Sequence, residues 1–111
     1  MSRRLILLTY TPQRADDAAA YDRWIRERDY PAFRQHPGIL EYSCFRVTRS
    51  VQGREWFSYF DLIFLADGVD FHRDLRTDPT IRKHAECYHQ TWFETPGPHN
   101  MTVSLADEIW G

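Results

Sequence analysis

Strand and helix patterns follow one another in this chain in an order that leaves few folds open. Two segments rich in β-branched and aromatic residues are adjacent in the middle of the chain. On each side of them along the sequence there is first a helix pattern and then, nearer the chain end, a further strand pattern. The order strand, helix, strand, strand, helix, strand predicts an antiparallel sheet with both helices on one face. The patterns cover residues 4–10, 16–35, 39–48, 54–65, 69–90 and 101–106.

Local signals support each of these elements. The run over 4–10 is apolar on both faces, which is typical of a central strand. Helix formers follow Asp16, a plausible N-cap, with a break expected at Pro31, and Asp78-Pro79 divides the second helical segment in two. A short turn over 50–53 joins the two middle strands, and 95–98 is expected to be a loop. We therefore predict one domain over 1–111 of the α+β class, with a ferredoxin-like βαββαβ order and a four-stranded antiparallel sheet.

Length and composition limit the partners. A chain of 111 residues has room for one core, and 14 basic against 16 acidic residues give no electrostatic footprint for a nucleic acid. Aromatic residues make up 15% of the chain, which is more than one core of this size needs. Several strands should therefore place large apolar and aromatic side chains on the sheet face without helices. Because such a face must be covered, we expect a homodimer in which two sheets close into a barrel.

Cysteine usage and the N-terminal segment indicate a compartment. Cys44 and Cys87 lie far apart and form no CxxC pair, so the default is a reduced, cytoplasmic protein. The apolar run after Arg4 is too short for a signal peptide or a membrane span, and no membrane partner is expected.

The two middle strands combine apolar and polar side chains on the same face. Alternation places Tyr42 with Arg46 on one strand and Tyr59 with Asp61 on the other. Apolar bodies with a few polar groups are typical of a ligand cavity, although Arg46 and Asp61 could equally form a solvent-exposed pair. The candidate substrate-binding residues are Tyr42, Arg46, Trp56, Tyr59, Phe60 and Tyr88.

Three residues are candidates for acid-base catalysis. His72 and His84 lie on or beside the apolar stripe of the second helical segment, and Asp29 ends the first helix near the expected cavity. Each could instead have a structural or surface role. His84 and His89 are five apart and no HExxH occurs, so no metal site is predicted, and no GxSxG, P-loop or GxGxxG is present.

The segment from Tyr21 to Pro31, followed by Pro37-Gly38-Ile39, resembles the dimeric α+β barrel superfamily, which includes EthD-like, antibiotic-biosynthesis monooxygenase, stress-responsive and REDY-like proteins. It is similar to the helix ending in His-x-Pro, and then Pro-Gly, of EthD-like proteins. Asp29 stands where those relatives often have histidine, so the role of that histidine does not carry over to this chain. The stretch Asp78-Pro79-Thr80-Ile81 likewise lacks the histidines of plant polyketide-cyclising members.

The resemblance implies a homodimer with one pocket per subunit between sheet and helices, acting on small aromatic or polyketide-like molecules. Many such proteins need no cofactor, whereas others use haem or only bind a ligand. Our first hypothesis is a cofactor-independent cyclase or aromatase of secondary metabolism, with Asp29, His72 or His84 as base and Tyr42, Arg46 or Tyr59 stabilising the developing oxyanion. The alternatives are a cofactor-free monooxygenase that converts a phenol to a quinone, a non-catalytic binding dimer and, less favoured, a haem protein.

Overall fold

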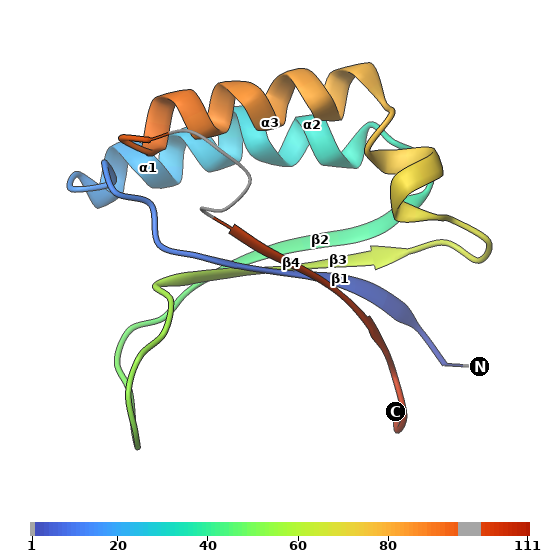
Figure 1. Ribbon diagram of the computed structural model, residues 1–111, viewed down its shortest axis with the longest axis horizontal. Coiled ribbons are helices and arrows are strands. Elements are labelled where there is room, and N and C mark those ends of the chain that lie inside the picture. The colour runs from blue at the N-terminus through green and yellow to red at the C-terminus, as the bar shows by residue number, and fades with distance from the viewer. Residues whose placement is uncertain (1, 96–100) are drawn as a thin grey trace.

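The computed structural model describes residues 2–95 and 101–111, which form an antiparallel sheet covered on one face by helices (Figure 1). The four strands stand in the order β2-β3-β1-β4, and all neighbours are antiparallel. This is the expected ferredoxin-like α+β fold. The strands are β1 (Arg4–Tyr10), β2 (Ile39–Arg46), β3 (Tyr59–Leu65) and β4 (Met101–Asp107), and the helices are α1 (Ala18–Trp24), η1 (Ile25–Asp29), α2 (Tyr30–Arg34), η2 (Phe71–Leu75) and α3 (Pro79–Trp92).

The first helix continues through Pro31, where the sequence predicts a break, and contains one π-helical turn, η1, just before it. Tyr21, Ile25 and Asp29 are buried at a spacing of four. In an α-helix a side chain rotates by about 40° over four residues, so such a stripe drifts off one face. A wider turn reduces this drift, and it also accommodates Pro31, whose ring would clash with the preceding turn of an α-helix. The π turn therefore keeps Asp29 directed toward the sheet.

The second helical segment is divided as the sequence predicts. The side chain of Asp78 accepts a hydrogen bond from the N–H of Ile81 at 3.0 Å and caps α3, and Pro79 occupies the first turn. The shorter piece, η2, begins after Asp70, which accepts from the N–H of Arg73 at 2.8 Å. The predicted loop over 95–98 lies outside the described residues, except for Thr95.

Each strand presents one face to the helices. The side chains of Ile6, Leu8 and Tyr10 in β1 are buried there, as are those of Ile63 and Leu65 in β3. A bulge between Ile39 and Glu41 corrects the predicted alternation of β2, because it turns Ile39 inward and leaves Leu40 66% exposed.

The connection between β2 and β3 is longer than the predicted turn over 50–53. β3 begins at Tyr59 rather than at Arg54, since residues 47–58 leave the sheet and project from it (Figure 1). One pairing hydrogen bond, from the N–H of Val47 to Ser58, continues past the strands, whereas the N–H of Ser58 turns to the carbonyl of Tyr10 at 3.1 Å. Trp56 therefore lies in a loop, 78% exposed, with the guanidinium of Arg54 5.0 Å from its ring centroid.

Ile63 tests this assignment of faces. It is 1% exposed in the sheet interior, so Ile63→Ala is expected to lower the free energy of unfolding by about 2–5 kcal/mol, because it removes buried methylene groups and leaves a cavity. Urea unfolding monitored by circular dichroism measures the change. Val51→Ala, at a position 90% exposed, is the control and should change stability by less than about 0.5 kcal/mol. Equal effects of the two substitutions would contradict the described core.

Candidate functional site

Two carboxylates are buried between the sheet and the helices. Asp29 at the end of η1 is 4% exposed, and Asp61 in β3 is 3% exposed. A charged carboxylate is costly to bury unless it is hydrogen-bonded or neutralised, so the groups around the two side chains determine what they can do.

Two tyrosines from neighbouring strands meet these carboxylates. The hydroxyl of Tyr10 in β1 donates to Asp61 Oδ1 at 2.6 Å. The hydroxyl of Tyr42 in β2 donates to Asp29 Oδ2 and also lies 3.0 Å from Asp61 Oδ2. Strand register places these groups together, because Tyr10 pairs with Tyr59 and Cys44 pairs with Asp61 across the sheet.

The hydrogen count at Tyr42 implies a proton on one of the carboxylates. A phenol has a single hydrogen and can donate fully to only one acceptor at a time. While Tyr42 donates to Asp29, a protonated Asp61 completes the network by donating to the phenol oxygen. The electrostatics agree with this arrangement: burial raises the pKa of Asp61 to about 7, the nearby Asp29 adds to the rise, and the hydrogen bonds from Tyr10, Cys44 and Tyr42 oppose it.

His84 lies on the other side of Asp29. Its Nε2 is 2.5 Å from Asp29 Oδ1, and both side chains are almost fully buried. The imidazole stacks on Trp24, with ring centroids 5.3 Å apart, and meets the edge of Phe33 at 5.6 Å. The ring is thus held by α1 and α2 while its nitrogen faces the carboxylate. The chain Asp61, Tyr42, Asp29, His84 forms a continuous hydrogen-bonded path from β3 to α3.

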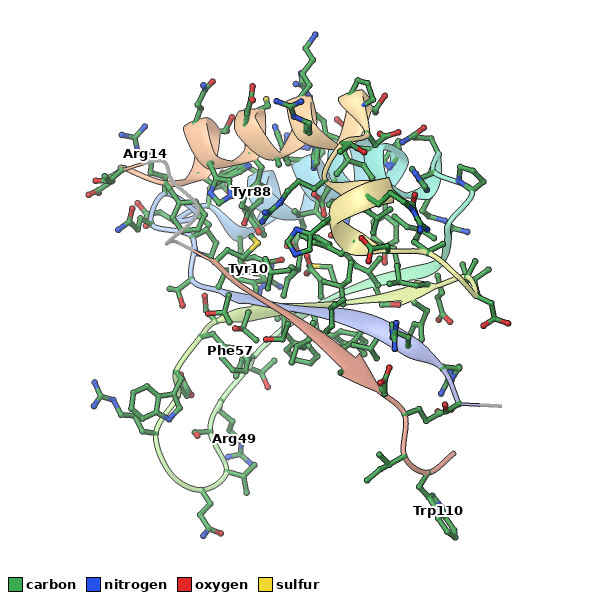
Figure 2. The ribbon with its side chains drawn as sticks, turned by 45° about the vertical axis from the view of Figure 1, so that its right-hand side comes forward. Tyr10, Arg14, Arg49, Phe57, Tyr88 and Trp110 are labelled. Carbon is green, nitrogen blue, oxygen red and sulfur yellow. The ribbon has the colours of Figure 1, made fainter. Side chains whose placement is uncertain are left out.

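A small cavity reaches this network. It has a volume of about 50 Å³ and is bordered by both carboxylates, His84, Tyr10 and Tyr88. Figure 2 shows the side chains of Tyr10 and Tyr88 in the space between sheet and helices, with Phe57 below the sheet. The hydroxyl of Tyr88 is 2.6 Å from that of Tyr21, and burial raises the pKa of both phenols, so neither is an anion near neutral pH.

A second hollow, of about 220 Å³, lies on the opposite side of the network, between α1 and the edge strand β2. Arg46 and Tyr59 border it, and Arg46 Nε donates to the hydroxyl of Tyr59 at 3.1 Å. Arg46 also forms an ion pair with Asp22. Cys44 lines this hollow as well, and burial raises the pKa of its thiol, which disfavours a nucleophilic thiolate.

The structure brings some of the predicted site residues together and separates others. Asp29, His84 and Tyr42 lie in one hydrogen-bonded network, and Tyr88 borders the cavity that reaches it. Three candidates lie elsewhere, since His72 is exposed on η2, Trp56 is in the projecting loop, and Phe60 points to the sheet face without helices and stacks on Phe45 at 4.9 Å. Arg46 and Tyr59 border the second hollow.

Asp61 and Tyr10 are site residues that sequence reasoning did not assign to catalysis. The mixed face of Tyr59 and Asp61 was a usable signal, because an acidic residue between apolar strand positions points to a buried carboxylate. The pairing of Asp61 with Tyr42 and Tyr10 depends on strand register, which composition does not reveal. Among residues 2–95 and 101–111, no group of three side chains is arranged to hold a metal ion, and no helix is long and apolar enough to cross a membrane.

Asp61 should make stability depend on pH. Its pKa is about 7 in the folded protein and about 4 in an unfolded chain, so between these values the folded state binds more protons and stability falls as pH rises. Asp61→Asn removes this dependence. The stability of the variant relative to wild type should therefore increase by about 2–3 kcal/mol between about pH 5 and pH 8, measured by urea unfolding at each pH. A constant difference over this range would exclude the proton on Asp61.

Known structures share this fold. The chain superposes on an EthD-family protein from Bacillus halodurans C-125 with a TM-score of 0.68 at 17% identity, covering 98% of this chain and 100% of the other. HapK from Hahella chejuensis superposes with a TM-score of 0.64 at 16% identity, covering 96% of this chain and 91% of the other. A dimeric ferredoxin-like protein of unknown function from Jannaschia sp. CCS1 superposes with a TM-score of 0.66 at 15% identity, covering 94% of this chain and 97% of the other. At these identities the likeness shows the fold.

The sequence comparison is more specific. No curated protein matches the chain. A family model described as REDY-like protein HapK matches residues 4–101, nearly the whole chain, which confirms the resemblance to REDY-like proteins. The fold is shared with the EthD-family protein as well. The chain therefore belongs to the family of REDY-like protein HapK.

Proposed function

We propose that this protein is a cofactor-independent enzyme that transfers protons on a small aromatic or polyketide-like substrate, as a cyclase or aromatase does. The observation that carries the proposal is the pair of buried carboxylates on either side of the Tyr42 hydroxyl. Catalytic acids and bases need pKa values near the working pH, and burial raises the pKa of Asp61 to about 7.

The two carboxylates have different partners and therefore suit different roles. Asp29 accepts from Tyr42 and faces His84, which fits a base held in one orientation. In the proposed reaction Asp29 removes a proton from a carbon next to a carbonyl. The neutral form of Asp61 donates a hydrogen bond to the enolate oxygen that develops. When the enolate carbon attacks a second carbonyl of the same molecule, a proton from Asp61 neutralises the new alkoxide.

The chain Asp61, Tyr42, Asp29, His84 then gives a route by which the proton returns. Each neighbour in it is within hydrogen-bonding distance, with 3.0 Å between Tyr42 and Asp61 and 2.5 Å between His84 and Asp29. Such a relay resets both carboxylates after a turnover without bulk water entering the core.

The proposal is tested with 2-tetralone, a bicyclic ketone with acidic protons at C1. Wild-type protein should accelerate exchange of these protons for deuterium, followed by NMR, and Asp29→Asn should lower the rate by about 100-fold or more because it removes the base. His84→Asn should lower it less, since the carboxylate remains. Circular dichroism checks that each variant is folded.

Asp16→Asn is the matched control, because Asp16 is exposed and outside the site, and it should exchange at the wild-type rate. Bound ketone with no acceleration by the wild type would indicate a binding protein instead. Oxygen uptake with a phenolic ligand, together with product formation that stops under anaerobic conditions, would indicate the monooxygenase alternative.

We also propose that the sheet face without helices is covered by a second copy of the chain. Figure 1 shows that all helices lie on the other face. Apolar side chains on the bare face are only half-buried or exposed, and a monomer seldom leaves such a contiguous patch in water. They are Leu5, Leu7, Phe45, Phe60, Leu62 and Phe64.

A charge on this face should separate the copies. Leu62→Glu is expected to convert a dimer to a monomer at micromolar concentration, measured by light scattering, because a buried unpaired carboxylate opposes association. Gln90→Glu adds the same charge on exposed α3 and should leave the dimer intact. A monomeric wild-type protein at micromolar concentration would contradict the proposed dimer.

A further inference from the structure

An apolar groove leads away from the carboxylate network along α3. It has a volume of about 220 Å³, and it shares Leu8, Phe33, Ala85, His89 and Met101 with the cavity that reaches Asp29 and Asp61. Its remaining walls come from η2, the centre of the sheet and β4. The groove and the cavity therefore adjoin each other across these side chains, and their combined size approaches the lower end of the range for small-molecule pockets, about 300 Å³.

The length of the groove limits the ligand. The α3 residues along it run from Ile81 to His89, and a helix rises 1.5 Å per residue, so the wall is about 12 Å long. The lining is mostly aliphatic and aromatic, with Ile6, Ile63 and Leu75 at its base. A ligand with one or two fused rings, or an alkyl chain of similar length, fits this space.

The outer part of the groove carries positive charge. Arg76, which follows η2, and Arg82 in the first turns of α3 both border it, and both are exposed. The guanidinium of Arg76 lies 5.2 Å from the ring centroid of Phe71, another lining residue. Within residues 2–95 and 101–111, neither arginine forms an ion pair. Two guanidinium groups are thus available to a ligand at the solvent side of the groove.

The cavity at one end and the groove mouth at the other have opposite charge character. The inner end is formed by the Asp29 and Asp61 pair, whose remaining negative charge repels an anion, whereas the outer end has Arg76 and Arg82, which attract one. A ligand with an anionic group at one end can bind in only one orientation, with its anion outward and its far end at the carboxylates. The charge distribution therefore selects both the class of ligand and its direction.

We infer that the groove binds a small apolar carboxylate, with the carboxylate at Arg76 and Arg82 and the opposite, reactive end at Asp29 and Asp61. This inference rests on the proposed function in taking the groove as the substrate site, and it names the substrate class. Guanidinium groups recognise carboxylates through paired N–H donors, which makes a carboxylate the natural anion for these two arginines. The reactive end would be a ketone or phenol, the groups on which the buried acids can act.

The probe for this inference is 2-naphthoate, with 2-naphthylmethanol as the uncharged analogue of the same ring system. Wild-type protein should bind 2-naphthoate about three- to tenfold more tightly, measured by isothermal titration calorimetry, because exposed charge pairs contribute modestly. The double substitution Arg76→Gln and Arg82→Gln should remove this preference and leave binding of the alcohol unchanged. High salt should likewise weaken binding of 2-naphthoate and leave binding of the alcohol unchanged.

Lys83→Gln is the matched control. Lys83 is the neighbour of Arg82 on the same helix, and its substitution removes the same charge. Because Lys83 does not line the groove, the Lys83→Gln variant should keep the preference for the carboxylate. Equal binding of the two probes, no binding of 2-naphthoate, or equal effects of Arg82→Gln and Lys83→Gln would each overturn the inference.

One further variant separates the ligand class from the chemistry. Asp61→Asn should keep or strengthen binding of 2-naphthoate, because it leaves the arginines intact and removes an acidic group from the inner end. If this variant binds as expected but the wild type fails to exchange protons on the ketone, the ligand class stands and the catalytic proposal fails. If the wild type exchanges protons on the ketone but shows no preference for the carboxylate, the catalytic proposal stands and the inferred ligand class fails.

Discussion

The hydroxyl of Tyr42, between the carboxylates of Asp29 and Asp61, is the interaction on which the rest of the site depends. Two negative charges this deeply buried and this close would repel each other in a medium that screens them poorly. A shared proton relieves that repulsion, and Tyr42 provides a bridge for it. Apolar residues in these positions would pack well and cost less stability. Stability therefore does not account for the pair, and acid-base chemistry is the role that we propose for it.

Three features of the backbone hold this arrangement in place. The π turn of η1 keeps Asp29 on the sheet-facing side, strand pairing places Tyr10, Tyr42 and Asp61 side by side, and α3 brings His84 down from the helical layer. None of the three is local to the others in sequence. The site therefore exists only when the sheet and both helical segments have docked, and water is excluded in the same step.

The sequence predicts the architecture and about half of the site because these depend on periodicity. Element order and apolar spacing are enough to predict the split unit, and the unusual Asp29 before x-Pro and the histidine on the apolar stripe of α3 are visible without coordinates. The site predictions that fail are those that depend on which face of a strand a single residue occupies, or on the length of a loop. Phe60 is one residue from both Tyr59 and Asp61 and so faces the opposite side of the sheet. Trp56 is lost to the site because β3 begins later than its composition suggests.

The same sheet separates the two proposed tasks, acid-base chemistry and association, by its two faces. On the helical side, polar groups are concentrated near the middle of an otherwise apolar layer, with the groove leading outward toward Arg76 and Arg82. On the bare side, large apolar side chains lie together, with Phe45 stacked on Phe60 at 4.9 Å, and polar Thr9, Ser43 and Ser104 lie among them. Alternation along β3 thus places Asp61 in the proposed acid-base site and its neighbours Phe60 and Leu62 on the face proposed for association. A substitution that alters one face leaves the other chemically unchanged, so binding and assembly can be measured independently in this fold.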